Sequence, residues 1–426
     1  MRRVLLVLGL LCLPGLAQAF CGFYVARSDG RLLNETSKVV YTRNGVFSTI
    51  TMSSDYQGPA SEFALVVPTP SVLERDDIRT VNPEIIAHLD RYTAPRLVEY
   101  FDEDPCTSPV LYEGVSVEET NSVFSRKEPS RPQRGPKALG VTVEASYAVG
   151  SYDIEILSAK RSDGLVTYLT QEGCKLPDGA APVLGDYIGA GMKFFVAKVN
   201  LARHDAETAQ ELQPLQIRFR SREFMLPIQL GKLNAEAPQT AVFYMLTSSG
   251  RVEVANYTAT ELPTNVDVPA FIEQMFPLFY TSVFQKAVGD RGGLVLEYGW
   301  DMGWCDPCAD DSVPNEDLRI LGARWLEPSD FPGEGVYVTR YRARYTKDQM
   351  PRDIMFKTTK NRDNFQGRYA IRHPFDGPMQ CEAAPEYIAA TKARLAEEAK
   401  TTVEMTGWDP GLVRRNIGRS VPAAYR

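Results

Sequence analysis

Length, composition and charge place the chain among ordinary folded proteins and exclude some partners. Its 426 residues are 44% hydrophobic and 24% charged, the balance of a globular protein with one large core or two packed lobes. Lys and Arg number 47 against 54 Asp and Glu, so the net charge is −7 at pH 7. Binding to phosphate backbones depends on clustered basic residues, and only residues 126–137 are locally basic, so we expect no nucleic-acid partner.

The N-terminal 19 residues have the three zones of a secretory signal peptide. Two arginines precede an apolar run over residues 4–13, and Ala17 and Ala19 form a small-x-small cleavage pattern. The apolar run is shorter than the roughly 20 residues that cross a bilayer, and no later stretch comes close. We therefore predict a signal peptide at residues 1–19, a periplasmic or extracellular location, and no transmembrane segment after cleavage.

Cysteine usage agrees with export. Cleavage removes Cys12 and leaves an even number of cysteines, and in an oxidising compartment disulfides are then the default expectation. The candidates are Cys21, Cys106, Cys174, Cys305, Cys308 and Cys381. The sequence leaves the pairing among them open.

The N-terminal part of the mature chain, residues 20–112, is predicted to be rich in strands. Its first four strands are expected at residues 23–26, 38–42, 46–52 and 63–67. We interpret them as one antiparallel sheet in which the last strand is buried on both faces. Asn82 and Pro83 start a helix, and a short strand follows over residues 97–101.

Residues 113–140 lose the apolar periodicity and combine prolines with charged side chains. A segment of that composition cannot bury enough apolar surface to become ordered. We therefore predict a mobile loop, or a linker between domains, at this place.

The main body is predicted over residues 141–380 and a C-terminal helical segment over residues 381–426. Further strands are expected at residues 141–147, 152–157, 193–199, 215–219, 224–229, 240–246, 251–256, 294–298, 336–344, 353–357 and 369–372. A short helix is expected near residues 183–187, and the clearest helix follows Asp267, with a kink at Pro277. The elements together predict an α+β fold of predominantly antiparallel sheets with a few helices, stapled by disulfides.

Short motifs spread over most of the mature chain point to a family. They are CGF at 21–23, FALVVP at 63–68, YTAPRL at 92–97, DPC at 104–106, VGSYD at 149–153, WCDPC at 304–308 and FQGRY at 365–369. As a set they resemble the exported bacterial family called domain of unknown function 2330. The resemblance implies an envelope or secreted location and carries no established activity.

The turn Trp304-Cys305-Asp306-Pro307-Cys308 concentrates the chemistry of the sequence. It is similar to the active-site turn of thioredoxins, in which a thiolate at a helix N-terminus attacks disulfides. Here the next helix is expected only at residues 314–321, with Ser312 as its cap, and the βαβ pattern of thioredoxins is missing. Nearby aspartates also oppose thiolate formation by like-charge repulsion. We favour a structural disulfide or buried turn, with redox exchange at Cys305 and Cys308 as the alternative.

Metal and hydrolase chemistry have less support. Zinc lacks a second ligand pair, because the chain has only 3 histidines and its other cysteines are scattered. Calcium could use the carboxylates of Asp306, Asp310 and Asp311, although their spacing matches no EF-hand and a solvated acidic loop explains them more simply. Since no hydrolase or phosphate-loop motif is present, we expect no cofactor.

The sequence therefore predicts an exported, non-enzymatic envelope or secreted component that binds a protein or a small-molecule ligand. The alternative function is a thiol–disulfide oxidoreductase that uses the turn at residues 304–308.

Overall fold

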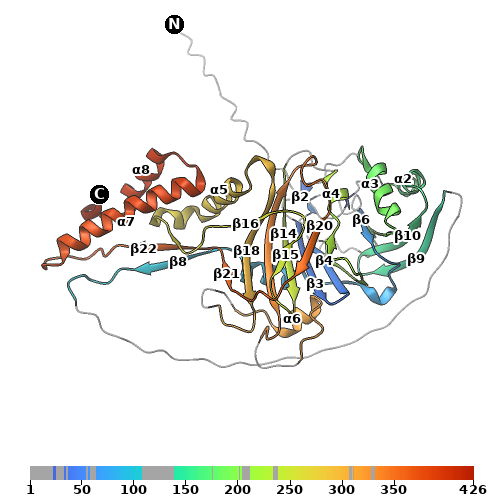
Figure 1. Cartoon of the computed structure of the whole chain (residues 1–426), viewed down its shortest axis with the longest axis horizontal. Helices are drawn as coiled ribbons and strands as arrows, with labels where there is room; N and C mark the ends of the chain where they lie inside the picture. Colours follow the sequence, from blue (N-terminus) through green and yellow to red (C-terminus); the bar gives the residue numbers. More distant parts are fainter. Residues whose placement is uncertain are drawn as a thin grey trace, which may run out of the picture.

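A computed structural model shows an α+β protein with several sheets, most of whose strand pairs are antiparallel (Figure 1). The predicted fold class is confirmed. The structure describes residues 23–24, 33–34, 37–53, 56–57, 64–107, 139–174, 176–200, 202–203, 212–233, 238–306, 309, 311–327 and 332–426. The predicted signal peptide, Cys21, Cys308, Asp310 and nearly all of the predicted loop at 113–140 lie outside these residues. None of the described helices has the length and hydrophobicity required to cross a bilayer.

The larger sheet has nine strands in the order β16-β18-β19-β14-β3-β4-β12-β7, with β21 pairing to β18. The strands are β3 (Ser37–Asn44), β4 (Phe47–Ser53), β7 (Ile78–Thr80), β12 (Leu215–Arg220), β14 (Gln239–Thr247), β16 (Ala259–Glu261), β18 (Gly293–Asp301), β19 (Tyr337–Tyr345) and β21 (Phe365–Gln366). β3 and β14 pair in parallel, with Val39 opposite Phe243, so distant parts of the sequence meet at the centre of the sheet.

The smaller sheet has five strands in the order β1-β6-β11-β10-β9, all antiparallel. They are β1 (Phe23–Tyr24), β6 (Ala64–Thr69), β9 (Val141–Val149), β10 (Tyr152–Ala159) and β11 (Lys193–Val199). β6 is buried along its whole length, as predicted. The prediction of a single N-terminal sheet is wrong, because β1 and β6 pair with later strands while β3 and β4 belong to the larger sheet.

The two sheets pack face to face, and helices cover both outer faces. Successive residues of a strand point to opposite faces, so Val39 of β3 lies in the core between the sheets and Val40 lies in the core under α1. α2 and α3 cover the smaller sheet, and α1 and α6 cover the larger one. These helices are α1 (Pro83–Thr93), α2 (Ser162–Gln171), α3 (Ala180–Gly189) and α6 (Asn315–Ile320).

The predicted long helix after Asp267 is divided. Ala270–Met275 form a 3-10 helix, and α5 (Phe276–Val288) begins directly after it. Pro277 lies in the first turn of α5, where its missing N–H leaves no hydrogen bond unmade. It therefore starts a helix and does not kink one.

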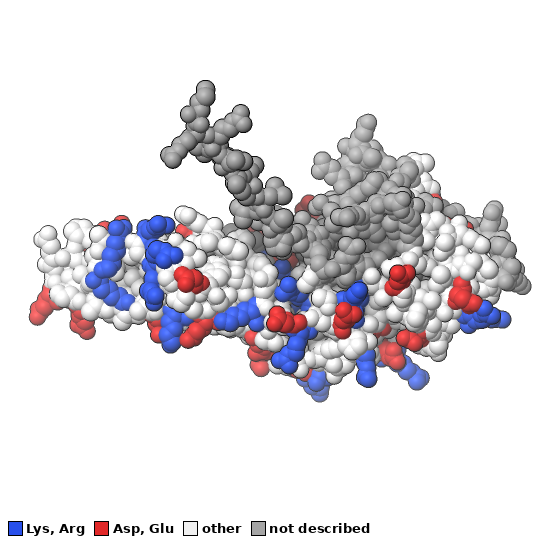
Figure 2. All heavy atoms as spheres, turned by 90° about the horizontal axis from the view of Figure 1, so that it is seen from above, with Lys and Arg blue, Asp and Glu red and all other residues white. Residues whose placement is uncertain are grey.

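The C-terminal helices α7 (Ala384–Thr406) and α8 (Pro410–Ser420) form an arm at the end of the molecule opposite α2 and α3 (Figure 1). A disulfide joins Cys106, which follows β8, to Cys381, which precedes α7. Arg394 of α7 also forms an ion pair with Asp102, at 2.8 Å. The arm is therefore tied to the body by a covalent bond and a charge pair. Lys and Arg side chains gather on its surface (Figure 2).

The remaining elements are short or lie beside the arm. A parallel sheet of β17 (Val266–Asp267), β22 (Arg368–His373) and β8 (Arg96–Phe101) leads toward the arm. The others are β2 (Leu33–Asn34), β5 (Tyr56–Gln57), β13 (Met225–Leu226), β15 (Val252–Val254), β20 (Ile354–Thr358), α4 (Gln229–Lys232) and 3-10 turns at Arg75–Asp77, Gly289–Arg291 and Ala423–Tyr425.

Candidate functional site

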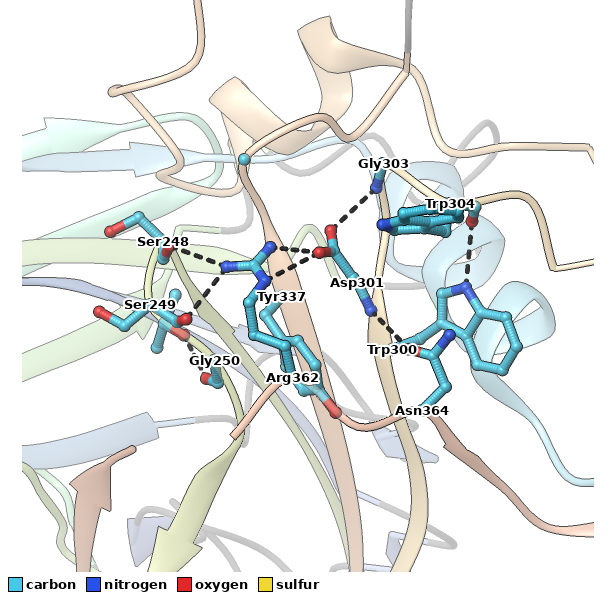
Figure 3. A network of polar contacts seen from close by, with 12 residues as sticks. Ser248, Ser249, Gly250, Trp300, Asp301, Gly303, Trp304, Tyr337, Arg362 and Asn364 are labelled. Atoms are coloured by element: carbon cyan, nitrogen blue, oxygen red, sulfur yellow. Dashed lines mark hydrogen bonds and ion pairs between the residues drawn. The ribbon is translucent and has the colours of Figure 1, made fainter. Parts of the chain in front are cut away.

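The predicted cysteine turn follows β18 and projects its indole into solvent. The Trp304 side chain is 70% exposed, and Cys305 is exposed beside it. A polar network holds the start of the turn (Figure 3). Arg362 donates to Asp301 Oδ2 at 2.8 Å, and Trp300 Nε1 donates to the Trp304 carbonyl oxygen at 3.0 Å. These hydrogen bonds therefore fix the start of the turn at the end of β18.

Asp306 points inward and is part of the core. Its side chain is buried and accepts hydrogen bonds from the Tyr298 hydroxyl at 2.9 Å and from Gln366 Nε2 at 2.8 Å. The guanidinium of Arg96 lies 3.7 Å from the same oxygen. A buried carboxylate with these partners anchors the turn to β18 and β21. This use leaves Asp306 poorly placed for the calcium alternative, and Asp310 lies outside the described residues.

The helix after the turn is displaced from the cysteines. α6 begins at Asn315 with Pro314 as its cap, so the predicted cap at Ser312 is wrong. Among the described residues no helix begins at Cys305, so the helix N-terminus that holds the cysteine of thioredoxins has no counterpart there. Cys305 forms no disulfide with any cysteine that the structure describes, and its redox pairing with Cys308 stays a prediction.

The other predicted site residues are dispersed. Cys106 and Cys381 form a disulfide, Cys174 is buried among the residues that α2 and α3 cover, and Cys21 lies outside the described part of the chain. His88 Nε2 lies 2.9 Å from the carbonyl oxygen of Asp311, which links α1 to the segment before α6. No group of three or more His, Cys, Asp or Glu side chains within the described ranges is arranged to hold a metal ion.

A cavity of about 730 Å³ lies over one end of the larger sheet. One wall is the same face of three adjacent strands, because Thr42 of β3 is opposite Thr49 of β4, and Thr49 is opposite Arg218 of β12. With a side-chain period of two, Phe47 and Arg220 then fall on this face as well. The wall lies on the face of the sheet that α6 covers, next to the end of that helix.

The opposite wall is the segment that follows α6. Thr42 Oγ1 donates to the carbonyl oxygen of Leu321 at 2.6 Å, which fixes the end of the helix on the sheet. Gly322 has φ +110°, and a Cβ there would lie 2.7 Å from Thr49 Cβ, so only glycine fits. This close approach places Arg324 and Trp325 over the strands as the second wall of the cavity.

The cavity has an excess of positive charge. Arg218 donates to Asp77 Oδ1 at 2.9 Å, and Asp77 is the only acidic residue among the described residues that line the cavity. Partial burial, followed by the nearby Arg218, lowers the pKa of Arg324. Burial, followed by Arg324 and Arg218, likewise lowers the pKa of Arg79 behind the wall. Burial is the larger cause of both shifts, and repulsion among the arginines adds to it; a bound anion would relieve the repulsion.

Arg324 is the clearest candidate for contact with a ligand. Its side chain forms no hydrogen bond or ion pair with any described residue, whereas Arg218 is engaged by Asp77 and Arg220 lies 5.0 Å from the centre of the Phe47 ring. Phe47 is 54% exposed, and Trp325 is fixed by a 3.0 Å hydrogen bond from Nε1 to the Gly335 carbonyl oxygen. The cavity thus offers guanidinium groups beside aromatic rings, which suits an anion with an apolar part.

Sequence reasoning missed this site. The strand at 215–219 was predicted, and its alternation of apolar residues with Gln216, Arg218 and Arg220 is the signal that could have been used. That alternation is equally typical of a strand with one solvated face. Only the segment after α6, which is distant in sequence, turns the face into a cavity.

The structure is that of an α+β protein with an arginine-lined cavity at one end of its larger sheet. Residues 15–357 match the family described as uncharacterized protein conserved in bacteria, domain of unknown function 2330, and the chain belongs to this family. The predicted resemblance is confirmed, and both walls of the cavity fall within the matched range. No curated protein and no solved structure matches the chain.

Proposed function

We propose that the protein is an exported envelope or secreted component that binds a small anionic ligand in the arginine-lined cavity. The observation that carries the proposal is Arg324, a cation on the cavity wall without a charged partner in the described structure. A carboxylate or phosphate would bind between Arg324 and Arg218, since guanidinium groups match the geometry of both anions. Phe47 and Trp325 would contact the apolar part of the ligand. The volume of about 730 Å³ is typical of small-molecule sites.

Two features support export. The first 19 residues have the zones of a signal peptide. The second is the Cys106–Cys381 disulfide, because disulfides persist in oxidising compartments and are rare in the reducing cytosol.

The binding proposal is tested by isothermal titration calorimetry with three probes: phenyl phosphate, inorganic phosphate and neutral benzyl alcohol. We expect phenyl phosphate to bind most tightly, because it carries both the anion and the ring. A hydrogen-bonded charge contributes roughly 1.5–3 kcal/mol, so Arg324→Gln should weaken binding about 10-fold or more. Arg222→Gln is the matched control, since Arg222 is exposed outside the cavity. Equal binding of phenyl phosphate to wild type and to the Arg324 variant, or no binding to either, would refute the proposal.

Thiol–disulfide exchange is the second candidate function. The observation in its favour is the exposed Cys305 beside an exposed indole. The displaced start of α6 and the carboxylate of Asp306 argue against a stabilised thiolate at this position.

A further inference from the structure

The arm contains a second concave site that is separate from the arginine-lined cavity. A groove of about 620 Å³ runs between α7 and α8. Leu395, Ala399, Val403 and Ile417 contribute apolar surface to it. Grooves between packed helices are common places for apolar ligands.

The groove is a preformed feature of the arm. α7 and α8 share a core that includes Leu395, Val413 and Ile417. Asp409 caps α8 by accepting a hydrogen bond from the Leu412 backbone N–H at 2.7 Å. The two helices are therefore held at a fixed spacing, and a ligand would not need to open them.

Positive charge is concentrated along the groove. Lys400, Arg414 and Arg426 line it, against one acidic residue, Glu404. Lys400 is paired with Glu397 at 2.9 Å, whereas Arg414 forms no ion pair with any side chain in the described part of the chain. The view from above shows Lys and Arg side chains gathered on the arm (Figure 2).

The basic charge of α8 is unusual for this chain. The expectation that only residues 126–137 are locally basic is wrong, because residues 410–426 contain four arginines and no Asp or Glu, although the whole chain has a net charge of −7. Arg415 and Arg419, which lie outside the groove, also form no ion pair with the described residues. They provide an internal comparison for Arg414, because they share its helix and its chemistry.

We propose that the groove between α7 and α8 binds an anionic amphiphile, a molecule with a hydrocarbon chain and a carboxylate or phosphate head. The hydrocarbon chain of the ligand would lie against Ala399, Val403 and Ile417, where each buried methylene contributes about 0.8 kcal/mol. The head would meet the guanidinium of Arg414. A purely polar anion would leave the apolar surface uncovered, and an uncharged hydrocarbon would leave Arg414 without a partner. We assign the groove to a free amphiphile; a lipid in a bilayer has the same chemistry, and the test with vesicles separates the two sources.

The test measures binding of monomeric decanoate, below its micelle concentration, to the purified full chain by isothermal titration calorimetry. We expect one decanoate to bind, acetate not to bind, and octyl glucoside to bind more weakly than decanoate. Arg414→Gln should weaken decanoate binding about 5- to 10-fold through loss of one charged contact. Arg415→Gln should change the affinity for decanoate by no more than about 2-fold, the range expected for an exposed charge outside the site. Ala399→Phe should fill the groove and lower the affinity for decanoate at least about 10-fold, because it blocks contacts with a few methylene groups.

Three results would overturn the proposal. Equal losses in the Arg414 and Arg415 variants would mean that decanoate senses the general charge of α8. Unchanged binding of decanoate to the Ala399→Phe variant would place the hydrocarbon chain elsewhere. Binding to phosphatidylglycerol vesicles without binding of decanoate would assign the arm to a charged membrane surface and not to a groove ligand. Binding of phenyl phosphate reports on the arginine-lined cavity and is expected to be the same in all these variants.

Discussion

The junction between the arm and the body contains a buried carboxylate that should make stability depend on pH near neutrality. Glu398 of α7 is 3% exposed, and its Oε1 lies 3.5 Å from Arg394 Nε without a hydrogen bond between them. Burial raises the pKa of Glu398 to about 7; Asp267 and Asp102 add to the rise, whereas Arg394 and Arg372 oppose it. The carboxyl group is thus favoured in its neutral form.

The size of the pH effect on stability follows from the shift in the pKa of Glu398. The ordinary pKa of 4.5 becomes about 7 in the folded protein. At about 1.36 kcal/mol per unit, the shift corresponds to about 3 kcal/mol. Because the folded pKa is raised, the stability contribution is fully present below about pH 4.5 and is lost as the pH rises through about 7. Glu398→Gln keeps a neutral side chain of similar shape and should remove this loss.

The assay is urea unfolding of wild type and variant between pH 5 and pH 8.5, followed by circular dichroism. We expect an advantage of less than about 1 kcal/mol for the Glu398→Gln variant at pH 5 and of up to about 3 kcal/mol at pH 8.5. Glu397→Gln is the control, because Glu397 is exposed on the same helix. If the two variants respond to pH alike, or if Glu398→Gln is less stable than wild type at pH 8.5, the argument from burial fails.

Two further predictions concern the core and the cysteine turn. Arg340→Met should lower the free energy of unfolding by about 3–5 kcal/mol, because it leaves the fully buried Glu297 without its charge partner, whose Nε lies 2.6 Å from Glu297 Oε2. Urea unfolding measures this loss, and a loss as small as that caused by Arg344→Met would contradict the prediction. Purified protein should not catalyse the reduction of insulin by dithiothreitol, because no helix N-terminus stabilises a thiolate at Cys305; turnover that disappears in Cys305→Ser would establish the oxidoreductase function instead.

Local signals in the sequence predicted local structure well. Asn82 was expected to start a helix, and its side chain accepts a hydrogen bond from the Glu84 backbone N–H at 3.0 Å at the start of α1. Asp409 caps α8 in the same way, by accepting a hydrogen bond from the Leu412 backbone N–H. Capping and strand alternation depend on a few neighbouring residues, so they can be read without knowing the fold.

Features that depend on distant residues were missed. α2 was not predicted, because its sequence includes Gly164 and β-branched residues that favour other structures. In the fold, Leu165 and Leu169 are fully buried against the smaller sheet, and Gly164 lets the helix approach Leu139, whose carbonyl oxygen leaves no room for a side chain. Packing against the sheet therefore overrides the weak local preference.

The same reasoning explains why the sequence drew attention to the cysteine turn and not to the arginine-lined cavity. Trp304 and Cys305 attracted a chemical interpretation because they are adjacent, and spacing along the chain is what a sequence displays. A binding cavity instead joins residues that the fold brings together, and here Arg218 comes from a strand while Arg324 comes from a turn after a helix on the other side of the cavity. Each arginine alone resembles a solvated surface residue. Their proximity depends on Gly322, because the close approach of its backbone to Thr49 places Arg324 over Arg218. A larger residue at position 322 should therefore abolish the binding of phenyl phosphate measured by calorimetry without removing either charge, and unchanged binding would contradict this role of Gly322.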